Sequence, residues 1–148
     1  MKLHYLFVFM LAVAFSVTSC NKCDPTSMDD GIIIKDVIIR AIGHPAGTPD
    51  PALVRQQGVF GIDYEVSTDG GYFYDPVDFE RFSVMCFPVT ARCSSGFLRT
   101  VTLDSEDKIV EYNMVVSECE SCETRNETYN WVLVEKVPDD YTPVFTLN

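Results

Sequence analysis

Residues 59–66 read Val-Phe-Gly-Ile-Asp-Tyr-Glu-Val, and their alternation decides the class of fold. Phe60, Ile62, Tyr64 and Val66 fall on one side of an extended chain, whereas the residues between them are small or acidic. A period of two is typical of a strand with one buried face. This stretch therefore predicts a half-buried antiparallel strand.

Similar alternation, or a run of β-branched residues, recurs along the chain and predicts about seven strands. Besides residues 59–66, the predicted strands are residues 32–42, 82–90, 97–103, 109–116, 129–137 and 141–147.

Turn signals separate the predicted strands. The stretch Asp69-Gly70-Gly71 is a tight turn, and the polar residues 104–107 predict a hairpin over residues 97–116. Prolines predict short helical turns within residues 48–57 and 75–81. We therefore expect an all-β protein, an antiparallel β-sandwich that is immunoglobulin-like or transthyretin-like in outline, with one or two short helical turns.

A long apolar run precedes the predicted domain. After Lys2 and His4, residues 5–17 are almost wholly apolar. As a helix this run would span roughly 20 Å, less than the roughly 30 Å hydrocarbon core that a transmembrane helix must cross. Its length and flanking residues are typical of a secretory signal peptide.

The end of this run, Val17-Thr18-Ser19-Cys20, resembles the lipobox of bacterial lipoproteins. The start is also similar to those of small uncharacterised lipoproteins of Bacteroidetes-type bacteria. The resemblance covers only about the first 20 residues. It implies removal of residues 1–19, a diacylglycerol thioether on Cys20 and an acyl chain such as palmitate on its amine. Two or three chains anchor a protein durably, and Asn21 after the cysteine favours the outer membrane.

The expected organisation is a signal peptide (1–19), a lipidated N-terminus and tether (20–31) and one domain (32–148). Loss of Lys2 with the signal peptide leaves 10 basic and 22 acidic residues, a net charge of −12. This acidity argues against nucleic acid as a partner, because phosphate binding needs clustered Lys and Arg. It also argues against binding to anionic headgroups, so the lipid on Cys20 is the expected link to the membrane. The expected location is the cell envelope, facing the periplasm or the exterior.

The cysteine count depends on that lipid. The chain has six cysteines, so lipidation of Cys20 leaves five in an oxidising compartment. An odd number leaves at least one thiol without a partner in the chain. Cys23, in the tether, is the expected free thiol and the candidate for an intermolecular disulfide. The disulfide candidates are Cys86, Cys93, Cys119 and Cys122.

These four cysteines allow two plausible pairings. In the local pairing, Cys86 is bonded to Cys93 and Cys119 to Cys122. In the crossed pairing, Cys86 and Cys93 are each bonded to one of Cys119 and Cys122. Crossed bridges close longer loops and stabilise more, but local pairing demands less of the fold and is preferred. A zinc site is disfavoured by the compartment. Redox chemistry at residues 119–122 is disfavoured by the neighbouring glutamates, which would raise the thiol pKa.

The polar residues form no catalytic constellation. His44, the only histidine after residue 19, lies in a Gly- and Pro-rich stretch and is expected to be an ordinary loop residue. Asp75, Asp78 and Glu80 lack calcium-loop spacing, and helix capping and solvation are their expected roles. Trp131 is expected in the core. We therefore expect no catalytic residue, metal or cofactor.

Aromatic residues gather after the glycine turn, at Tyr72, Phe73 and Tyr74. Exposed rings there would stack on sugars or anchor a protein partner, whereas rings turned inward would cover the end of the sandwich. The expected function is a lipid-anchored envelope protein acting as a non-catalytic binding or structural module, with a glycan or protein ligand. The alternative is an envelope enzyme, either a hydrolase using carboxylates or a thiol oxidoreductase at Cys119 and Cys122.

Overall fold

The structure is a computed structural model that describes residues 26–43, 50–119 and 122–148. The predicted signal peptide, Cys20, Cys23 and His44 lie outside these ranges. The described chain is nearly all strand, which confirms the all-β class. Its elements are β1 (Met28–Gly31), β2 (Ile38–Gly43), β3 (Ala52–Val54), the 3-10 turn η1 (Val59–Gly61), β4 (Ile62–Ser67), β5 (Asp75–Pro76), β6 (Phe82–Arg92), β7 (Ser95–Asp104), β8 (Ile109–Glu118), β9 (Arg125–Glu135) and β10 (Thr142–Leu147).

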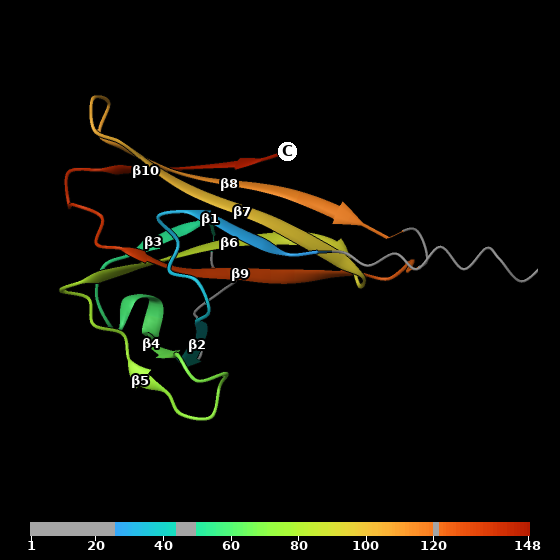
Figure 1. Ribbon diagram of the computed structural model, residues 1–148, viewed down its shortest axis with the longest axis horizontal. Helices are drawn as coiled ribbons and strands as arrows, with labels where there is room; N and C mark the ends of the chain where they lie inside the picture. Colours follow the sequence, from blue (N-terminus) through green and yellow to red (C-terminus); the bar gives the residue numbers. More distant parts are fainter. Residues whose placement is uncertain (1–25, 44–49, 120–121) are drawn as a thin grey trace, which may run out of the picture.

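The strands form three sheets that stack as layers (Figure 1). The first sheet has the order β1-β7-β8-β10, the second β3-β6-β9 and the third β2-β4-β5. β7 and β8 pair antiparallel, so the predicted hairpin is confirmed. β1 and β10 pair parallel to β7 and β8, at the two edges of the first sheet. The fold is thus a sandwich-like stack of mostly antiparallel sheets, with parallel edge strands that the pattern of alternation does not reveal.

β6 is buried on both faces because its sheet is the middle layer. On one face, Met85 and Phe87 join the core shared with Tyr112 of the first sheet. On the other face, Val84 packs into a second core with Tyr64 of the third sheet. A strand covered on both sides reads as a continuous apolar run rather than an alternation. This run in β6 is the sequence signal for the third layer, which the expected two-layer sandwich does not include.

The alternating stretch of residues 59–66 is a strand from Ile62 onward. Ile62 and Tyr64 are buried, as predicted, and Asp63 between them is exposed. Residues 59–61 instead form η1, between Gly58 and Gly61, whose φ angles of 73° and 72° suit glycine. The strand therefore starts three residues later than predicted.

Both predicted helical starts are wrong within the described residues. Residues 52–54 form β3 against β6, and residues 75–76 form β5 against β4. A strand edge already present in the fold satisfies these backbone groups, so pairing overrides the local proline signal. What remains of the second start is a turn, in which the backbone carbonyl of Asp78 accepts the N–H of Phe82 at 2.9 Å.

The folded chain begins before the predicted boundary at residue 32. β1 pairs residues 28–31 with residues 98–101 of β7. The carboxylate of Asp29 receives two hydrogen bonds from Arg99, at 2.6 and 2.9 Å. A pair of parallel bonds of this kind fixes both position and orientation. The predicted tether therefore ends before Met28.

Candidate functional site

The candidate site is the connection between β4 and β5, which we call the aromatic loop (residues 67–74). In Figure 1 it lies at the lower end of the molecule, beyond the third sheet, where it extends away from the stacked layers. It starts at Ser67, the last residue of β4, and ends directly before Asp75 of β5. Both ends are thus held by one antiparallel strand pair.

Two side chains fix the backbone of the aromatic loop. The hydroxyl of Ser67, which is buried, donates to Asp69 Oδ1 at 2.6 Å and accepts the N–H of Gly71 at 3.0 Å. The same oxygen of Asp69 accepts the N–H groups of Tyr72 and Phe73, each at 3.1 Å. Asp and Ser often replace backbone partners in turns in this way. Hydrogen bonds between residues of the loop itself therefore hold its conformation.

Two glycines allow this conformation. Gly70 and Gly71 have φ angles of 78° and 94°, in the region that favours glycine. A Cβ at Gly71 would lie 3.1 Å from Tyr74 Oη and 3.4 Å from Ile38 Cδ1. The absence of a side chain at position 71 thus lets the loop pack closely against β2.

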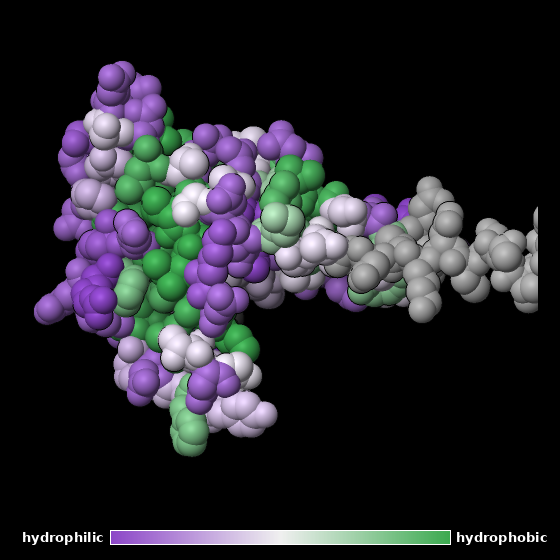
Figure 2. Space-filling model, viewed as in Figure 1, coloured by the Kyte–Doolittle hydropathy of each residue, from purple (hydrophilic) through white to green (hydrophobic). Residues whose placement is uncertain are grey.

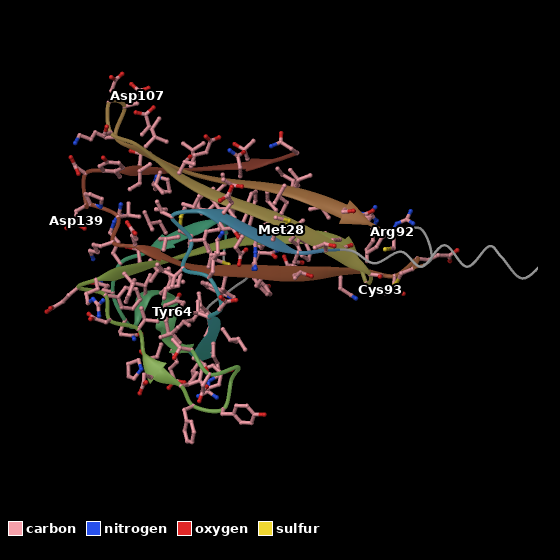
Figure 3. All side chains as sticks on the ribbon, viewed as in Figure 1. Met28, Tyr64, Arg92, Cys93, Asp107 and Asp139 are labelled. Carbon is pink, nitrogen blue, oxygen red and sulfur yellow. A yellow bond between two sulfur atoms is a disulfide. The ribbon has the colours of Figure 1, made fainter. Side chains whose placement is uncertain are left out.

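Tyr72 and Phe73 point into solvent at the end of this fixed backbone. Tyr72 is 84% exposed and Phe73 is 79% exposed, the highest values among the large hydrophobic residues that the structure describes. Figure 2 shows a hydrophobic projection at the lower end of the molecule, and Figure 3 shows rings that extend there from the loop. Side chains this large and apolar are rarely exposed together without a partner.

Tyr74 differs from its two neighbours, because it is partly buried and already in contact. The guanidinium of Arg40, on β2, lies 4.0 Å from the centre of the Tyr74 ring. Arg40 also donates through Nε to Glu65 of β4 at 3.0 Å. This stack joins the third sheet to the base of the aromatic loop. Of the three predicted ligand-binding aromatics, two are therefore exposed and the third is held by the sheet.

The charge of Asp69 supports the loop. Its hydrogen bond from Ser67, followed by those from the backbone of Phe73 and Tyr72, lowers the pKa of the carboxyl below its usual value. Donors that point at a carboxylate favour the charged form. Asp69 is thus ionised at neutral pH, in the form that accepts the loop N–H groups.

The cysteines form a second cluster, at the end of the first two sheets. Cys93, after β6, is bonded to Cys122, before β9, with the Cα atoms 5.9 Å apart. In Figure 3, Cys93 lies beside Arg92 at the end opposite Asp107 and Asp139. Cys119 is disulfide-bonded as well.

The preferred local pairing is therefore wrong. Cys86 is a free, buried thiol. Cys86 lies inside β6, which extends through Arg92, so Cys93 is about 20 Å away along an extended chain. Cys122 is near because the N–H of Cys93 donates to the carbonyl of Thr124 at 2.9 Å. One crossed bridge thus forms, and Cys86 is no longer a disulfide candidate.

The thiol of Cys86 is unreactive at neutral pH. Burial raises the pKa of its thiol to about 12, so the nucleophilic thiolate is not populated at neutral pH. The nearby Tyr64 hydroxyl is also buried, and burial, followed by the charge of Cys86, raises its pKa to about 12. Tyr64 belongs to the second core, and Cys86 is buried within β6.

The remaining candidates have structural roles. Asp78 Oδ1 accepts the N–H of Glu80 at 3.0 Å, so Asp78 caps a turn rather than the expected helix. Trp131 packs against Tyr64 with ring centres 5.4 Å apart. Across residues 26–43, 50–119 and 122–148, no three His, Cys, Asp or Glu side chains are close enough to hold a metal ion. No helix in the described part of the chain is long and apolar enough to cross a membrane.

The residues that hold the loop were not among the predicted site residues. Ser67 and Asp69 are spaced as in a side-chain-supported turn, so their roles are readable in principle from Ser-Thr-Asp-Gly-Gly. Arg40 is 34 positions from Tyr74, and no local pattern joins the two. No protein-family model matches the chain, and comparison with curated proteins and with solved structures found no match.

Proposed function

We propose that the protein is a lipid-anchored cell-envelope protein whose domain binds a glycan or protein ligand through the aromatic loop, without catalysis. One observation carries the binding role: Tyr72 and Phe73 are exposed on a loop that Ser67 and Asp69 hold in one conformation. Binding to an ordered loop costs little conformational entropy. Rigid aromatic side chains also bring large contact areas with few rotatable bonds.

The charges around the two rings limit the classes of ligand that the loop can bind. Asp75 directly follows the aromatic loop and is exposed, and Arg40 is engaged with Glu65 and Tyr74. An anionic ligand would meet uncompensated negative charge here. A neutral sugar face or an apolar protein side chain fits two uncharged rings better.

The envelope location rests on the lipobox-like residues 17–20. The described chain starts at Thr26, six positions after Cys20. Six residues span at most about 20 Å, so a lipid on Cys20 would keep the domain close to the membrane. An intact mass for the purified protein that includes residues 1–19 would contradict the anchor.

The binding role is tested by NMR titration of the ¹⁵N-labelled protein with neutral oligosaccharides from plant and bacterial cell walls. Shifts confined to the amides of residues 67–74 are expected with a binding sugar. The variant Tyr72→Ala/Phe73→Ala should weaken that binding at least tenfold. Leu103→Ala, which removes an exposed apolar side chain of β7 (37% exposed), is the matched control.

A protein ligand is tested with the same variants, by co-purification from envelope extracts. A partner retained by Leu103→Ala but lost with Tyr72→Ala/Phe73→Ala would identify the loop as its contact. Binding of either class that survives the double substitution would contradict the proposal. The oxidoreductase alternative needs Cys119 and Cys122 as one exchangeable pair, whereas Cys122 is bonded to Cys93.

A further inference from the structure

We propose that Cys119 forms its disulfide with Cys23, so that the N-terminal tether is bonded covalently to the end of the domain. Cys119 is disulfide-bonded, Cys93 and Cys122 bond each other, and Cys86 is free. Of the six cysteines, only Cys20 and Cys23 are left as partners within the chain. The choice of Cys23 rests on the proposed lipid anchor, because a thioether sulfur cannot form a disulfide.

The direction of β1 brings the tether to Cys119. β1 is parallel to β7, with Met28 beside Leu98, and the hydroxyl of Ser27 accepts the N–H of Phe97 at 3.1 Å. The chain before β1 therefore heads toward the first residue of β7. Cys119 lies at this same end, since its N–H donates to the carbonyl of Ser94 at 2.9 Å.

The tether is long enough to close the bond. β1 and β8 flank β7, so the line of β1 lies two strand spacings, about 10 Å, from the line of β8. The four residues from Ser27 back to position 23 reach up to about 14 Å. A disulfide needs Cα atoms roughly 4.4–6.8 Å apart. Because β7 starts at Ser95, the tether can cross beyond its end without displacing β1.

Side-chain contacts hold the end of the domain that would receive this bond. Glu118, which precedes Cys119, accepts from Arg125 at 2.8 Å and from the N–H of Arg92 at 3.2 Å. Cys119 itself is buried. A bond to Cys23 would leave only positions 20–23 between lipid and domain, a span of about 10 Å. The free tether would be half as long as the span from Cys20 to Thr26, and this end of the sheets would face the membrane.

The bond requires an oxidant of the envelope. The thiolates of Cys23 and Cys119 would lose two electrons to the disulfide of a thiol–disulfide oxidoreductase, through a mixed disulfide, and the oxidoreductase would leave as its dithiol. With this pairing all six cysteines are assigned, as two disulfides, one buried thiol at Cys86 and one lipidated Cys20. It differs from the expectation that Cys23 is free for another chain.

A peptide map of the alkylated, non-reduced, lipidated protein tests the pairing. Trypsin releases residues 23–35, 93–99 and 109–125, which two disulfides would hold together as one species. Cleavage after glutamate then separates Cys119 from Cys122, because Glu120 lies between them. We expect residues 23–35 linked to the dipeptide 119–120, and residues 93–99 linked to residues 121–123.

Other products of the map overturn the pairing in distinguishable ways. Cys119 linked to a peptide that contains Cys20 would refute both this pairing and the lipid anchor. An alkylated Cys23 with lipid on Cys20, or Cys23 joined to a second chain, would refute the pairing alone. Linkage of residues 23–35 to residues 121–123 would refute the assignment to Cys119.

A thiol count in denaturant gives an independent readout. The wild-type protein should show one thiol, from Cys86, and Cys119→Ser and Cys23→Ser should each show two. Cys86→Ser is the matched control and should show none. More than one thiol in the wild-type protein (three if Cys23 and Cys119 are both reduced), or an unchanged count in Cys23→Ser, would overturn the pairing.

Discussion

Ser67 Oγ donates a 2.6 Å hydrogen bond to Asp69 Oδ1, and that oxygen also accepts the backbone N–H groups of Tyr72 and Phe73. One carboxylate oxygen thus holds the two residues whose rings are exposed. The order of the aromatic loop depends on this oxygen more than on packing, since both rings contact mainly solvent.

Asp69→Ala should therefore release the loop without unfolding the domain. The N–H groups of Tyr72 and Phe73 would lose their acceptor, and heteronuclear NOE values at these amides should fall. Asp104→Ala is the matched control, because Asp104 Oδ1 holds the N–H groups of Glu106 and Asp107 in the hairpin turn. An Asp69→Ala protein with unchanged NOE values at residues 72 and 73 would show that the loop is ordered by other contacts.

The loop should also loosen at low pH. Hydrogen bonds lower the pKa of Asp69 in the folded protein, whereas an unfolded Asp titrates near pH 3.9. The contribution of Asp69 to stability is then complete above roughly pH 4 and is lost as the pH falls through the lower, folded value. In ¹⁵N spectra recorded from pH 6 to pH 2, the amides of Tyr72 and Phe73 should shift together, with a midpoint below about 3.9. A midpoint above that value would contradict the assigned hydrogen bonds.

Gly31→Ala should destabilise the protein more than Gly58→Ala. The two glycines have almost the same φ, 74° and 73°. A Cβ at Gly31 would collide with the backbone carbonyl of Val101, whereas a Cβ at Gly58 meets no atom within 4 Å. We expect a loss of about 1 kcal/mol from backbone strain at Gly58, and at least about 2 kcal/mol at Gly31. Urea unfolding measures both, and equal losses would show that β1 separates from β7 at little cost.

Tyr64→Phe should leave the free energy of unfolding unchanged or raise it slightly. Tyr64 Oη is buried and has no hydrogen-bond partner among the described residues, so its removal relieves an unsatisfied group. Tyr112→Phe is the contrast, because Tyr112 Oη donates to the carbonyl of Asn130 at 3.3 Å. Its loss should cost about 0.5–1.5 kcal/mol. Thermal unfolding of the two variants compares them directly, and a larger loss for Tyr64→Phe would reveal a partner for that hydroxyl.

The class of fold and the place of the candidate site were readable from the sequence, because both depend on local chemistry. The alternation at Ile62 and Tyr64 and the polar turn after Asp104 specify strands and a hairpin. Consecutive glycines before Tyr72 specify a turn that carries aromatic residues. These signals act over a few residues and need no knowledge of the rest of the chain.

The strand order and the cysteine pairing were decided by the tertiary structure, because they depend on which chain ends meet in space. Cys93 and Cys122 are 29 positions apart, and they come together only because β6 and β9 are neighbours. Cys86 and Cys93 are close in sequence, but an extended strand separates them. In the same way, Arg40 reaches Tyr74 because β2 pairs with β4. Backbone pairing between distant strands fixes these contacts, and no pattern within a single stretch of sequence records it.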